Sequence, residues 1–63
     1  MIVSNPLRLL LVDDEALART RLRHVLDDIS AEVPTVVIGE AQDGYGALVL
    51  VQEQPCDIVL VDI

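Results

Sequence analysis

The chain has 63 residues, a formal net charge of −7 and a hydrophobic fraction of 52%. A chain of this length forms one small domain at most, and the hydrophobic excess suggests apolar faces that something else covers. The negative charge argues against contact with nucleic acid or with an anionic membrane surface. The single cysteine, Cys56, allows no internal disulfide and fits a cytoplasmic location. No apolar run approaches the roughly 20 residues that a membrane-spanning helix needs.

The first element predicted is a buried strand. Residues 1–6 form a short lead-in, and the apolar run Leu7–Val12, interrupted by Arg8, follows it. A nearly continuous apolar run is typical of a strand that is buried on both faces. Two acidic residues, Asp13 and Asp14, come directly after it.

A helix is predicted next, over about residues 15–30. The apolar positions follow a spacing of three and four residues, which is one stripe of an α-helix. The stripe consists of Ala18, Leu22, Val25, Leu26 and Ile29. Arg19 and Arg23 fall on the opposite, polar face, where Arg23 is four residues before Asp27 and is expected to pair with it.

The second half of the chain repeats the alternation of strand and helix. The β-branched run Thr35–Ile38 predicts a strand, and Gly39–Gly44 predicts a turn. Asp43 is placed to cap a helix over Tyr45–Gln54, with an inner stripe of Ala47, Leu48 and Val51. A third strand, Ile58–Val61, then ends at Asp62.

The order β-α-β-α-β predicts an α/β fold with a parallel sheet and right-handed crossovers. If the order of strands in the sheet is 2-1-3, the first strand is central and the two helices cover opposite faces. The carboxyl ends of the first and third strands are then adjacent, at the point where ligands bind in open α/β sheets.

That arrangement brings three carboxylates together, from Asp13, Asp14 and Asp62. Carboxylates at close range repel one another, and such a cluster commonly holds a hard cation such as Mg²⁺. Each acidic position has a simpler interpretation by itself. One of Asp13 and Asp14 could cap the following helix, and Asp62 could begin a turn. The combination of the pair with Asp62 favours the metal site.

The segments Leu10–Glu15 (LLVDDE) and Asp57–Ile63 (DIVLVDI) resemble the first and third strands of bacterial response-regulator receiver domains. The segment Gly39–Gly44, followed by Ala47 and Leu48, is similar to the turn and second helix of that family. The resemblance covers residues 7–63, which would form the first three strands and two helices of an incomplete receiver domain. It implies a partial flavodoxin-like (CheY-like), doubly wound fold.

The resemblance also implies a function. Asp62 would accept a phosphoryl group from a sensor histidine kinase, and Asp13 and Asp14 would hold Mg²⁺ together with it. The segment would therefore be a phosphoryl acceptor and not itself an enzyme. The family's phosphoryl-contacting lysine and hydroxyl residue, and its aromatic switch residue, would lie past Ile63, and this sequence contains no lysine.

Several alternatives stay open. The helix segment Glu15–Leu22 resembles the LytTR/AlgR-type branch, whose members carry a DNA-binding domain, so transcription control is the expected output of the parent protein. A haloacid-dehalogenase-type phosphotransferase is a second possibility, although its two aspartates two residues apart are only approximated by Asp13 and Glu15. A third is a structural fragment that acts through assembly, because an uncovered third strand and bare sheet faces favour self-association.

Overall fold

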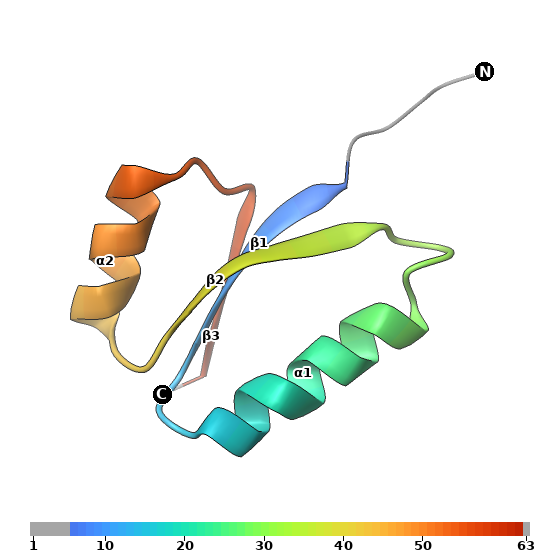
Figure 1. The fold of residues 1–63 in the computed structure, drawn as a ribbon, viewed down its shortest axis with the longest axis horizontal. Helices are drawn as coiled ribbons and strands as arrows, with labels where there is room; N and C mark the ends of the chain where they lie inside the picture. Colours follow the sequence, from blue (N-terminus) through green and yellow to red (C-terminus); the bar gives the residue numbers. More distant parts are fainter. Residues whose placement is uncertain (1–5, 63) are drawn as a thin grey trace.

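A computed structural model describes residues 6–62 of the chain (Figure 1). Except for Pro6, the predicted lead-in lies outside this range, as does Ile63. The elements, in chain order, are β1 (Leu7–Asp13), α1 (Ala16–Asp28), β2 (Thr35–Ala41), α2 (Gly44–Glu53) and β3 (Ile58–Asp62). Neither helix in the described range is long and apolar enough to cross a membrane.

The three strands form one parallel sheet in the order β2-β1-β3, which confirms the predicted fold class and strand order. β1 lies in the middle, and its residues Leu9, Leu10, Leu11 and Val12 are each at most 2% exposed. Successive side chains of a strand point to opposite faces, so this run of buried residues requires cover on both faces of the sheet. The structure is consistent with a partial flavodoxin-like fold.

The two helices supply that cover from opposite sides (Figure 1). On the α2 side, Leu10, Val12 and Ala41 form a buried cluster, against which Ala47 and Leu50 of α2 pack. The predicted inner stripe of α2 was right for Ala47 but wrong for Leu48 and Val51, which are 55% and 42% exposed. The stripe runs through Leu50 because this residue, three positions after Ala47, lies over Gly39 of β2.

β2 extends to Ala41, so the prediction of a turn from Gly39 onward was wrong for Gly39–Ala41. These residues pair with Leu10, Leu11 and Val12 of β1, and the pairing outweighs the low strand propensity of glycine. A Cβ atom at position 39 would lie 3.2 Å from Leu50 Cδ1, so the glycine lets α2 approach the sheet closely. The register shifts by one residue between Leu9 and Leu10, where Ile38 is left as a bulge.

At the other end of the sheet, Asp57 connects the start of β3 to the start of β1. Its carboxylate accepts a hydrogen bond from the Arg8 backbone N–H at 2.8 Å, and its own N–H donates to the Arg8 carbonyl at 2.8 Å. The Arg8 guanidinium lies 3.4 Å from the same carboxylate. The backbone hydrogen bond, and then the side-chain hydrogen bond, hold the pKa of Asp57 below its ordinary value.

The N-terminus of α2 yields a stability prediction. Asp43 is the N-cap, as predicted from the sequence, and its carboxylate accepts a hydrogen bond from the Gly46 N–H at 2.8 Å. We expect Asp43→Ala to lower the free energy of unfolding by about 1 kcal/mol, because an N–H of the first turn loses its partner. Urea denaturation measures the change. Asp43→Ser keeps a capping oxygen and is the control, and equal losses in both variants would contradict the assignment.

Candidate acidic site at the strand ends

Asp13 and Asp62 lie side by side at the carboxyl ends of two adjacent parallel strands. They are the last pair in the register between β1 and β3. Neighbouring strands are about 4.8 Å apart, so two such residues on one face have their carboxylates within reach of a common ligand. The predicted adjacency of these two strand ends is therefore present in the structure.

The first of these carboxylates is held by the backbone that follows it. Asp13 Oδ1 accepts a hydrogen bond from the Glu15 N–H at 2.9 Å, which closes a turn between β1 and α1. The N-cap of α1 is Glu15, and its side chain makes no capping hydrogen bond. The simpler interpretation of the acidic pair as a helix cap is therefore wrong, because neither Asp13 nor Asp14 is the N-cap and Asp13 accepts from the N–H of the N-cap residue itself. Asp14 and Asp62 are exposed.

Both strand-end aspartates line one hollow of about 150 Å³ between the sheet and α1. Its floor is apolar, and a cation, Arg19, also lines it. The remaining lining residues are Leu11, Val12, Leu22, Leu60 and Val61. The hollow therefore combines two carboxylates and one guanidinium at the edge of the sheet where ligands bind in this class of fold.

The three predicted metal ligands are not gathered into one group. Between residues 6 and 62 there is no set of three or more His, Cys, Asp or Glu side chains arranged to hold a metal ion. Asp13 and Asp62 are adjacent, whereas Asp14 is exposed beyond the strand end. The donor chemistry suits a hard cation, since all three side chains offer carboxylate oxygens. The described residues thus provide two adjacent carboxylates of the right kind and a third one residue further along the chain.

A set of ionic contacts beside the hollow was missed by the sequence analysis. Arg19 and Arg23 were assigned to the polar face of the first helix, but both contact Glu40 of β2. Arg19 Nε lies 2.8 Å from Glu40 Oε1, and Arg23 Nε donates to Glu40 Oε2. The predicted pairing of Arg23 with Asp27 is replaced by this contact, because Glu40 projects from the sheet toward α1. The sequence analysis ended the second strand at Ile38 and placed Glu40 in a turn, so it did not expect Glu40 opposite the first helix. In the structure β2 extends to Ala41 and includes Glu40.

These contacts change the acidity of Glu40. The hydrogen bond from Arg23 is the largest cause that holds its pKa below the ordinary value, and Arg19 acts in the same direction. Partial burial raises the pKa and does not reverse the net effect. Glu40 is therefore ionised at neutral pH and is shared between two arginines of one helix.

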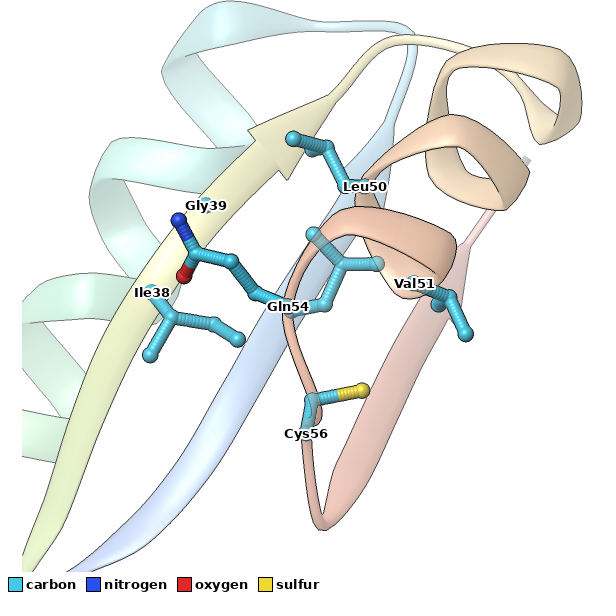
Figure 2. A pocket seen from close by; sticks show the side chains of 7 residues that line it. Ile38, Gly39, Leu50, Val51, Gln54 and Cys56 are labelled. Carbon is cyan, nitrogen blue, oxygen red and sulfur yellow. The ribbon is translucent and has the colours of Figure 1, made fainter.

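A second hollow lies on the α2 side of the sheet and is separate from the acidic residues. It is lined by Leu10, Ile38, Gly39, Leu50, Val51, Gln54 and Cys56 (Figure 2). The space has no room for a water molecule, and its lining is almost wholly apolar. Cys56 is partly buried and packs against the core cluster.

The arrangement defines an α/β segment with a parallel 2-1-3 sheet and acidic residues at the ends of its first and third strands. Over all 63 residues the chain is 46% identical to a protein from Myxococcus xanthus named protein-glutamate methylesterase/protein-glutamine glutaminase 5. The chain spans 17% of the length of that relative. No protein-family profile matches the sequence, and no solved structure matches it.

Glu40 yields a prediction about pH. A carboxyl group whose pKa is lowered on folding stabilises the fold above its unfolded pKa, and this contribution is lost as the pH falls through the folded pKa. We therefore expect Glu40→Gln to lower the free energy of unfolding by about 1 kcal/mol at pH 7 and by progressively less below about pH 4. Urea denaturation across this range tests it. A loss that stays constant with pH would show that charge is not the cause.

Proposed function

We propose that the chain is the first part of a phospho-accepting receiver domain of a two-component response regulator, with Asp62 as the acceptor. The observation that carries the proposal is the pairing of Asp13 with Asp62 at the ends of two adjacent parallel strands. The strand order 2-1-3 and the likeness to a methylesterase and glutaminase over the whole chain support it. The sequence resemblance to receiver domains points to the same family.

The chemistry of such a site follows from its carboxylates. A lone pair of an Asp62 carboxylate oxygen forms a bond to phosphorus, the bond between phosphorus and the donor breaks, and its electron pair leaves with the donor. The product is an acyl phosphate on Asp62. Because Asp62 is exposed at the strand end, a donor can approach it from solvent.

We propose Mg²⁺ as the cofactor, with Asp13, Asp14 and Asp62 as its protein ligands. When bound, Mg²⁺ would offset the repulsion between the acidic side chains and a phosphoryl donor. One carboxylate oxygen of Asp13 already accepts a hydrogen bond from the Glu15 N–H, and its other oxygen is available to the cation. The exposed Asp14 would act directly or through a bound water molecule.

The partner that this function implies is a sensor histidine kinase, and the site of action is the cytoplasm. For the output of the longer protein we favour an enzyme of the methylesterase and glutaminase kind, because a relative with that name is similar over the whole chain. A LytTR/AlgR-type DNA-binding output, and with it control of transcription, is the alternative that the segment Glu15–Leu22 suggests. The residues that follow Ile63 in the longer protein distinguish the two.

Phosphorylation at Asp62 is directly testable. In the longer protein we expect Asp62→Asn to abolish acyl-phosphate formation from a small phosphodonor and to leave the fold intact, because Asn keeps the shape and removes the nucleophile. Intact mass with and without hydroxylamine measures the modification. Asp28→Asn, which changes an exposed aspartate at the end of α1, is the control and should be modified like the wild type.

Two outcomes would contradict this assignment. One is a phosphoryl group that persists on the Asp62→Asn protein. The other is continuous release of phosphate from a phosphomonoester by a catalyst that depends on Asp13, which would favour the haloacid-dehalogenase-type alternative. The 63-residue chain alone is expected to take up little phosphate, because the cationic contacts that the family supplies from later strands are not in its sequence.

We also propose that the 63-residue chain self-associates. β3 pairs with β1 on one side, and within residues 6–62 no strand pairs with its other side. Val61 is 60% exposed, and Ile58 and Val59 are exposed as well. An unpaired apolar strand edge recruits other chains, and each large apolar side chain that it buries contributes about 1.5–3 kcal/mol.

Sedimentation of the 63-residue chain tests this proposal. We expect the apparent mass to rise with concentration above the 6.9 kDa of one chain. Val61→Lys places a charge on the exposed strand and should weaken association, whereas Val25→Lys is the control. The predicted inner stripe of the first helix was wrong for Val25, which is 53% exposed on α1. A concentration-independent monomer with a cooperative thermal transition would overturn the proposal.

A further inference from the structure

We propose that Arg19 is a positioning residue for the acidic site, and that it fixes the end of β1 from which Asp13 projects. This inference rests on the proposed function. Arg19 of α1 donates from Nη1 to the backbone carbonyl of Asp13 and from Nε to Glu40 Oε1. One side chain thus connects the helix to the ends of both β1 and β2.

The surroundings of Arg19 differ from those of Arg23, which lies four residues further along α1. Its side chain is 18% exposed, whereas that of Arg23 is 46% exposed. Both arginines contact the carboxylate of Glu40, but the contact to the Asp13 carbonyl belongs to Arg19. Arg19 and Arg23 therefore carry the same charge and share the contact to Glu40, but Arg19 also holds the end of β1.

The contact to the Asp13 carbonyl bears on the direction of the Asp13 side chain. The planar guanidinium fork presents its donors in a fixed geometry, so two simultaneous contacts restrict the backbone of Asp13 relative to Glu40. On the other side of this residue, the Glu15 N–H holds Asp13 Oδ1. Asp13 is thus held through its carbonyl and through its carboxylate at the hollow that it lines together with Asp62.

Charge and positioning predict opposite effects when Arg19 is replaced. Arg19 lines the hollow, so removing its positive charge favours a bound cation on electrostatic grounds alone. Loss of positioning has the reverse effect, because a ligand that is no longer held binds metal more weakly. The sign of the change in Mg²⁺ affinity therefore separates the two roles.

The experiment uses the full-length protein that carries these residues. Mg²⁺ is titrated calorimetrically into the wild type, Arg19→Gln and Arg23→Gln. We expect Arg19→Gln to raise the Mg²⁺ dissociation constant about tenfold, as the loss of an outer-sphere contact does in other metal sites. Arg23→Gln removes the same charge without touching Asp13, and its dissociation constant should be unchanged or lower.

A second readout needs no metal. The amide ¹⁵N shifts of Asp14 and Glu15 in the metal-free protein should move in Arg19→Gln and stay at their wild-type values in Arg23→Gln. Arg19→Lys keeps the charge and reaches only one of the two partners at a time. Arg19→Lys should therefore fold like the wild type but bind Mg²⁺ more weakly than the wild type does. It serves as the test variant if Arg19→Gln does not fold.

The outcomes distinguish this inference from the function on which it rests. If the wild type binds Mg²⁺ and either Arg19→Gln or Arg19→Lys binds it equally well or more tightly, the positioning role is overturned and the proposed function stands. If the wild type neither binds Mg²⁺ nor forms an acyl phosphate on Asp62, both are overturned. Weaker binding in both Arg19 variants, with Arg23→Gln unaffected, supports the inference.

Discussion

The burial of β1 on both faces is the constraint on which the rest of the structure depends. Leu9 to Val12 are essentially inaccessible to solvent, and a three-stranded sheet achieves this only if β1 is central and a helix lies on each side. With parallel strands and crossover helices, these requirements leave the order 2-1-3. The hydrophobic effect acting on four consecutive residues thus determines which strand ends become neighbours.

The location of the acidic side chains follows from this topology. β1 and β3 run in the same direction, so the residues that follow their apolar segments emerge at the same edge, and Asp13 faces Asp62 across it. Neither aspartate is part of the core, and neither could be placed by its own local preference. The core positions them, and the turn to Glu15 and the guanidinium of Arg19 then restrict one of the two.

The sequence predicted the parts of this structure that depend on periodicity. Alternation of apolar runs indicated the elements and a parallel sheet. The strand order 2-1-3 was adopted as a condition, and under that condition Asp13 was expected beside Asp62, as the structure has it. Periodicity did not give the contacts of Arg19 and Arg23, because helical spacing identifies the polar face of a helix but not how far a long side chain reaches around it. A guanidinium near the edge of that face extends past the apolar stripe to a carboxylate on the sheet.

The end of β2 was misjudged for a related reason. Gly39 lowers local strand propensity, and the compensation comes from pairing with β1 and contact with Leu50, which are far away in the sequence. The choice of Leu48 and Val51 over Leu50 as inner residues of α2 failed similarly, since every position from Ala47 to Val51 is apolar and no polar face marks the helix.

The bulge at Ile38 has a consequence for how insertions and deletions act in this segment. In a regular strand, Val37 and Glu40 would point to opposite faces, but the extra residue between them inverts the alternation, so both share a face with their partners on β1, Leu9 and Leu11. The bulge therefore lets β2 carry one extra residue without turning Glu40 away from α1. With Ile38 deleted, Val37, Gly39 and Glu40 would follow one another in a regular strand, and Glu40 would still share a face with Leu11. A one-residue deletion at the bulge is thus absorbed locally, because the face on which Glu40 lies is set by its pairing with Leu11 of β1.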